Sequence, residues 1–172
     1  MRTSRLLIAG IIIVVVMMVA FIVIQPPTAN APDVEPTANG SDMAVQIASE
    51  RDLWEAANVG NYTIRVRVAD LPFSDITHIV TVRDGEVSDY QVQCDIIAQP
   101  SACTPDPARA ADYSVEGLFA IAEARAAAAT GSRQVAIEFD PTYHYPARIS
   151  TSIPDAVDSA TLWQVVRFDL SG

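Results

Sequence analysis

The sequence predicts an α+β domain, a mostly antiparallel sheet of about six strands with two helices on one face, preceded by one transmembrane helix. Three observations predict this fold. Several short runs alternate apolar and polar residues, which is typical of strands with one solvated face. Two other segments carry apolar residues at helical spacing. The order along the chain is helix, three strands, helix, three strands, and such an order favours an antiparallel sheet covered on one side.

The N-terminal segment predicts a membrane anchor. Residues 6–24 are nineteen residues without a charge or a hydrogen-bonding side chain. As a helix they would span about 28 Å, close to the hydrocarbon thickness of a bilayer. Arg2 and Arg5 place residues 1–5 in the cytoplasm and the remainder outside, so we expect a single-pass protein of the cell membrane with an extracytoplasmic C-terminal domain. A cleaved signal peptide is the alternative, because Ala29-Asn30-Ala31 offers a cleavage pattern of small residues.

Composition limits the partners of the rest of the chain. Residues 25–41 contain four prolines and few apolar side chains, so we expect a linker there and a single domain over 42–172. The chain has 21 acidic and 11 basic residues and a formal charge of −10. This charge repels phosphate backbones and argues against nucleic acid as a partner. A cationic protein or peptide is easier to accommodate.

The two cysteines, Cys94 and Cys103, both lie in the part of the chain expected outside the cytoplasm. Thiols tend to oxidise there, so we predict a structural disulfide between them. Their spacing matches neither a redox C-x-x-C pair nor a zinc pattern. We therefore expect no metal and no cofactor.

The first half of the domain begins with a helix. Ser49 and Asp52 resemble a capping box, although a start as early as Ser41 also fits, and the apolar face ends near Gly60. Residues 62–68 then alternate as a strand whose polar face is basic.

Residues 76–94 predict a hairpin, because Asp84-Gly85 lies between two β-rich runs and suits a type I′ turn. A two-residue turn leaves the later apolar residues of the second strand out of phase with the buried face. A bulge near Ser88 or Asp89 would restore the register, and we predict one there.

The second half begins with a helix capped by Ser114 and ending near Gly131. Its apolar positions follow i, i+3, i+4, i+7 and i+11: Val115, Leu118, Phe119, Ala122 and Ala126. Strands are then predicted over 135–139, 147–151 and 161–170, with a proline-containing turn after the first of them.

Several segments resemble a known family. They are residues 114–119 (SVEGLF), 139–146 (FDPTYHYP), Leu53-Trp54 before 62–64, and 82–87 (VRDGEV). Together they resemble a bacterial family of secreted or lipoprotein-type envelope domains of unknown function. The strongest mark of that family reads roughly Tyr-Asp-Pro-x-x-Gly-Tyr-Pro, and here Phe139 replaces the tyrosine and His144 the glycine. The resemblance implies an envelope location and a fold for most of the domain, but no chemistry.

The candidate binding residues are in that aromatic turn: Asp140, Tyr143, His144 and Tyr145. An Asx-type turn, in which Asp140 accepts from the amides after it, is the structural alternative. The other histidine, His78, shares a strand face with Val80 and Val82, so we expect it to be packed or hydrogen-bonded and not a ligand.

No motif of a known catalytic site occurs, so we expect no enzymatic activity. The first hypothesis is a noncatalytic envelope module that binds a protein or peptide, with exposed strand edges able to accept an added strand. The alternative is a small-molecule or cell-wall ligand binder centred on Tyr143, His144 and Tyr145. A purely structural spacer is a third hypothesis.

Overall fold

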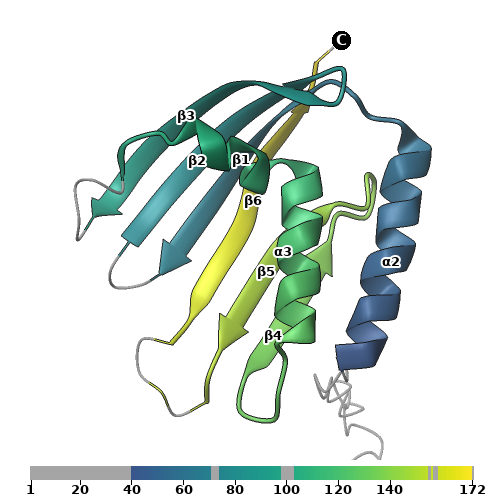
Figure 1. Cartoon of the computed structure of the whole chain (residues 1–172), viewed down its shortest axis with the longest axis vertical. Coiled ribbons are helices and arrows are strands. Elements are labelled where there is room, and N and C mark those ends of the chain that lie inside the picture. The colour runs from purple at the N-terminus through teal and green to yellow at the C-terminus, as the bar shows by residue number, and fades with distance from the viewer. Residues whose placement is uncertain (1–39, 71–73, 98–102, 155, 157–158, 172) are drawn as a thin grey trace, which may run out of the picture. The chain divides into compact units, whose positions relative to one another are not determined.

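The computed structural model describes residues 40–70, 74–97, 103–154, 156 and 159–171 (Figure 1). The predicted cytoplasmic segment and membrane anchor, residues 1–24, and nearly all of the predicted linker lie outside the described residues. Among the residues that are described, no helix has the length and apolar character needed to cross a membrane.

The described domain has the predicted α+β architecture. Its sheet has six strands in the order β3-β2-β1-β6-β5-β4, and every neighbouring pair is antiparallel (Figure 1). The strands are β1 (Tyr62–Asp70), β2 (Ser74–Arg83), β3 (Glu86–Ile97), β4 (Gln134–Phe139), β5 (Pro146–Ser152) and β6 (Thr161–Leu170). The first and last strands are therefore central, and β3 and β4 are the edges.

One face of the sheet is covered by helices: α2 (Gly40–Ala57), the short 3₁₀-helix η2 (Pro107–Tyr113) and α3 (Val115–Ala127) (Figure 1). The sequence predicted two of these three. A single apolar core lies between the helices and the sheet, and its most deeply buried side chains include Ile47, Ile64, Val66, Val80, Leu118, Phe119 and Ile149. Burial of this apolar surface is the main force that holds helices and sheet together.

Helix α2 is longer than the capping-box interpretation suggested. It begins at Gly40, so the alternative start near Ser41 is the correct one and Ser49 lies inside the helix. It ends at Ala57 because Asn58 takes a left-handed conformation with φ of 48°, a role the prediction gave to Gly60.

Polar contacts fix α2 to α3. Arg51 pairs with Glu123 at 2.8 Å and with Glu116 at 3.3 Å, and the Trp54 indole donates to Glu116 at 3.0 Å. The guanidinium of Arg51 also lies over the Phe119 ring at 4.7 Å. Helix α2 is thus attached to the rest of the domain by an aromatic residue and by a half-buried arginine.

The predicted hairpin and its bulge are both present. Asp84 and Gly85 have φ of 52° and 79°, as a type I′ turn requires. Val82 pairs with Val87, but Thr81 pairs with Asp89, so Ser88 is the extra residue of a bulge. The register beyond the bulge then places Tyr90 opposite Val80.

Helix α3 also follows the prediction at its start. The Ser114 hydroxyl accepts from the Gly117 amide at 3.2 Å, and all five residues of the predicted apolar stripe are buried. Gly117 permits a close approach to η2, because a Cβ there would lie 2.2 Å from the Ala111 carbonyl oxygen. The predicted cap at Gly131 is wrong: the helix ends at Ala127, and Ala128 completes the last turn in right-handed conformation by donating to the Ala124 carbonyl at 3.1 Å.

Candidate functional site

The turn between β4 and β5 contains the four candidate binding residues, and Asp140 organises it. The Asp140 carboxylate accepts from the amides of Thr142 at 2.9 Å and Tyr143 at 2.7 Å. Its carbonyl accepts from the His144 amide, and its amide donates to the Tyr145 carbonyl, both at 2.9 Å. These are the hydrogen bonds of the Asx-type alternative, so the polar groups of Asp140 hold the turn.

His144 attaches the same turn to helix α2. Its backbone has φ of 66°, a left-handed conformation that glycine adopts more readily, at the position where the resembled motif has glycine. Its Nδ1 lies 2.8 Å from a carboxylate oxygen of Glu50, which is 94 residues away in the sequence. No local sequence pattern around His144 indicates this partner.

The two tyrosines of the turn diverge. Tyr145 is 6 % exposed and packs with Trp54 and Phe168 at ring distances of 6.4 and 4.7 Å. Burial raises the pKa of its phenol to about 12. Tyr143 stays half-buried against Phe168 at 5.5 Å. Tyr145 is therefore mainly a core residue, whereas Tyr143 remains accessible.

A shallow depression lies beside this turn. It has a volume of about 290 Å³ and is broadly open to solvent, with walls from residues 165–168 of β6 and from Asp140, Thr142, Tyr143 and Tyr145. His144 points instead to α2, so the turn does not gather its candidate residues around one enclosed cavity.

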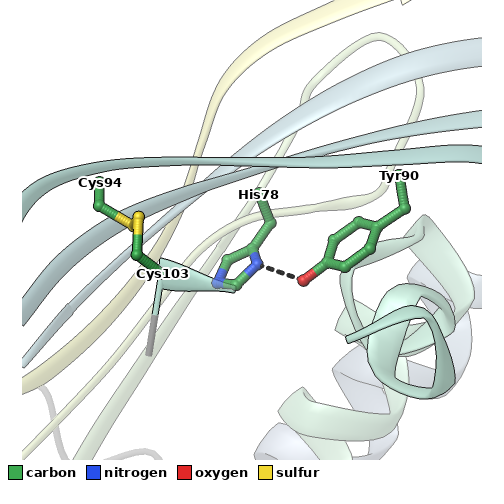
Figure 2. Close-up of a disulfide and its surroundings, with 4 residues drawn as sticks. All are labelled: His78, Tyr90, Cys94 and Cys103. Atoms are coloured by element: carbon green, nitrogen blue, oxygen red, sulfur yellow. Dashed lines mark hydrogen bonds between the residues drawn. A yellow bond between two sulfur atoms is a disulfide. The ribbon is translucent and has the colours of Figure 1, made fainter. Parts of the chain in front are cut away.

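The disulfide between Cys94 and Cys103 is present, with Cα atoms 6.0 Å apart (Figure 2). It joins β3 to the segment that leads into η2. Tyr113 at the end of η2 stacks on the His78 ring at 3.5 Å, with an angle of 6° between the ring planes. The crosslink therefore lies beside β3, at the part of the sheet that η2 covers.

His78 is packed, as predicted. It is 7 % exposed, and its Nδ1 lies 2.8 Å from the Tyr90 hydroxyl (Figure 2). Burial, with a smaller contribution from the positive charge of Arg109, lowers the pKa of His78 to about 4. Within the described part of the chain, no group of three or more His, Cys, Asp or Glu side chains is placed to hold a metal ion.

A recess between α2 and the edge strand β4 was not predicted. It has a volume of about 170 Å³ and a mainly apolar lining: Met43, Gln46, Ile47, Val135, Ala136, Ile137 and Phe139. The alternation of apolar residues in β4 is visible in the sequence. The alternation alone does not reveal that α2, which lies about 90 residues earlier in the chain, packs beside this strand.

Comparison with known protein families places the chain in a family. The model of a family of unknown function, DUF6174, matches residues 46–170, which run from the middle of α2 to the end of β6. No match was found among curated proteins or among solved structures.

Proposed function

Because the chain belongs to DUF6174, a family of unknown function, we propose its function from the geometry of the domain: it is a noncatalytic module that binds an extended segment of a partner protein along β4. One observation carries the proposal, namely a sheet edge that lies beside an apolar recess. The hydrophobic residues 6–24 and the disulfide support a location in the cell envelope, outside the cytoplasm.

The backbone of β4 supplies the first part of this binding mode. β4 pairs with β5 on one side, and no strand among the described residues pairs with its other side. Backbone amide and carbonyl groups on the outer side of an edge strand are a template for another extended chain. A partner segment bound there would become the seventh strand of the sheet, with its affinity supplied largely by main-chain hydrogen bonds.

The recess supplies side-chain selection. Val135, Ile137 and Phe139 of β4 turn toward the helix-covered face and are half-buried. Alternate side chains of an added strand would point the same way and enter the space between β4 and Met43 or Ile47 of α2. A segment with apolar residues at every second position fits this surface.

Charge indicates which segments would bind. The chain has a formal charge of −10, so a partner with basic residues around the apolar ones is attracted at long range, and an acidic one is repelled. Association with a second copy of the same acidic domain is disfavoured for the same reason.

The turn at residues 140–145 offers less support for a small-molecule site. The depression beside it is shallow, and the Asp140 carboxylate already accepts two backbone amides. Small-molecule pockets are usually concave and bury most of the ligand.

Peptide display on the full-length chain tests the proposal. We expect the selected peptides to share alternating apolar residues and basic flanks. Hydrogen exchange with one selected peptide should then show new protection in β4 and none in β3. Protection confined to β3, or to the depression beside Tyr143, would refute the assignment.

A matched pair of lysine substitutions separates the two sheet edges. Val135→Lys places a charge in the recess beside β4, whereas Val87→Lys places the same charge on the edge strand β3, where Val87 is already 37 % exposed. We expect V135K to weaken peptide binding at least tenfold and V87K less than twofold. Circular dichroism and thermal unfolding must show both variants folded.

A further inference from the structure

The second face of the sheet has no helix over it among the described residues (Figure 1). The strand registers place four arginines on this face. On β1 the core-facing residues are Ile64 and Val66, so the residues between and after them, Arg65 and Arg67, lie on the uncovered face. Register places Arg167 of β6 on this face, opposite Arg65. Arg148 of β5 is opposite a β6 residue that itself pairs with Arg67, so it lies on the same face. This set of four is called the arginine face below.

Three of these four arginines have carboxylate neighbours. Arg67 makes a two-pronged pair with Asp75, with Nε at 2.8 Å and Nη2 at 2.5 Å from its oxygens. Arg167 donates to Asp169 at 2.6 Å. Arg148 lies 4.0 Å from Glu138, a looser contact between two exposed side chains. These pairs offset much of the positive charge of the face.

Arg65 differs from the other three. No carboxylate among the described residues pairs with it, and its Nε is buried without a hydrogen-bond partner. Its neighbours across the two adjacent strands are Ile79 on β2 and Arg167 on β6. Like charges directly opposite each other destabilise a sheet, and a buried donor without an acceptor is costly. The face therefore has at Arg65 a positive charge that no carboxylate among the described residues offsets.

We propose that the arginine face is a second binding surface, which takes a carboxylate side chain of a partner protein between Arg65 and Arg167. A carboxylate bound to the outer nitrogens of these guanidinium groups would lie between the two positive charges and offset their repulsion. Guanidinium groups bind carboxylates with particular strength because two parallel hydrogen bonds match the planar shape of both groups. The proposal does not depend on strand addition at β4, which lies at the sheet edge.

A carboxylate on a protein fits better than a polyanion such as nucleic acid or a polyphosphate. A polyanion has a negative charge on every repeat, and the acidic remainder of the chain, with its formal charge of −10, would repel it. A protein can present one or two acidic side chains to the arginines and be neutral or basic elsewhere. The face is part of a sheet, which also suits contact with another protein surface.

NMR titration of the full-length chain, labelled with ¹⁵N, tests the site directly. The probe is a capped synthetic peptide of serines with a single glutamate at its centre, and the same peptide with glutamine in place of the glutamate is its neutral control. We expect a saturable shift of the Arg65 Nε–H resonance with the glutamate peptide and none with the glutamine peptide. If the Arg65 resonance stays unchanged with the glutamate peptide, the proposal is wrong.

Substitutions then distinguish a specific binding site from non-specific electrostatic attraction. Arg65→Gln should weaken binding of the glutamate peptide at least tenfold. Arg109→Gln makes the same change of charge on η2, which covers the opposite face, and its effect should stay below twofold. Equal losses in the two variants would overturn the proposal. Arg167→Gln repeats the test if R65Q gives a poorly dispersed spectrum.

A titration with inorganic phosphate identifies the kind of anion. We expect the glutamate peptide to saturate the Arg65 shift at a concentration at least tenfold lower than phosphate does. Tighter binding of phosphate would overturn the assignment to a protein carboxylate.

Discussion

The two edges of the sheet, β3 and β4, differ in how far they are protected against further strand pairing. β3 pairs with β2 through two register irregularities, one of them at Ser88, and carries exposed acidic residues at Asp89 and Asp95. It is also crosslinked through Cys94. In β4 the residues from Gln134 to Ile137 carry no charge and pair regularly with β5, with one irregularity at Phe139. Bulges and charges are the usual devices that block edge pairing.

This difference is the reason why we assign the proposed strand addition to β4 and not to β3. β3 carries several such devices, whereas β4 is regular and uncharged from Gln134 to Ile137, has one charge at Glu138 and lies beside an apolar recess. The two edges are therefore unequal as surfaces for strand addition. If the two edges are independent, changes to His78, the disulfide or the bulge at Ser88 should affect β3 and its neighbour β2 and leave β4 unchanged.

A fall in pH should lower the stability of the domain most strongly, through His78 on β2 beside β3. The pKa of His78 is lowered to about 4 in the folded domain, whereas the unfolded chain has the ordinary value of 6.5. Below pH 6.5 the unfolded state takes up a proton that the folded state excludes, so stability falls as the pH falls toward 4. Between pH 7 and 4.5 this contribution is about 2–3 kcal/mol.

Urea unfolding at both pH values measures this effect, and His78→Gln is the comparison. The carboxylates titrate in both proteins, so the difference between them isolates the histidine. We expect H78Q to lose about 2 kcal/mol less than the parent between the two pH values. An identical loss would show that His78 is not the group responsible.

Removal of the disulfide should have the next largest effect. The crosslink closes a loop of about ten residues, and the chain-entropy estimate gives about 2–3 kcal/mol of stability. We expect a Cys94→Ser, Cys103→Ser double variant to lose this amount in urea unfolding. Hydrogen exchange should accelerate in β3 and stay unchanged in β4. Acceleration of both edges alike would mean that they are not independent.

Deletion of Ser88 should alter association more than stability. The residue is the extra one of the bulge, so its loss leaves Val82 paired with Val87 and Thr81 with Asp89 but makes the edge flatter. We expect a change in stability within about 1 kcal/mol, because no other pair shifts. Sedimentation velocity should show more dimer than the parent at equal concentration. Unchanged association would show that the bulge does not protect β3 against pairing with another chain.

His144→Gly should have the smallest effect. Glycine relieves a left-handed strain of about 1–2 kcal/mol but loses a contact with Glu50 of about 0.5–1.5 kcal/mol, so the two terms nearly cancel. His144→Ala keeps the strain and loses the contact, and it should destabilise by about 1 kcal/mol. Thermal unfolding of both variants measures the difference. Equal destabilisation would show that the strain is negligible.

Local patterns predicted local structure well. The Asp84-Gly85 turn, the bulge near Ser88 and the apolar stripe of α3 follow from rules that involve neighbours in the sequence, and the structure has all three. The Asx turn at Asp140 is of the same kind. The prediction of a cap at Gly131 is wrong because the Ala128 amide completes the last turn of the helix without a left-handed residue.

The candidate site depends on long-range order, which the sequence patterns do not contain. Nothing near β4 identifies it as an edge, because its position follows from the insertion of β6 between β1 and β5. The contact of Glu50 with His144 and the recess beside Met43 arise for the same reason, since both need α2 beside distant segments. Helix η2 was missed because its short segment follows prolines and lacks a helical stripe.

The central position of β6 has a consequence for the order in which the protein can fold. β6 is made after every other described strand, yet it joins the β1-β2-β3 sheet to the β4-β5 hairpin. Until residues 161–170 have been synthesised, these two parts have no shared strand, and β1 exposes a pairing edge. Such unpaired edges favour aggregation of incomplete chains. The nascent protein therefore depends on its last strand to become a single cooperative unit.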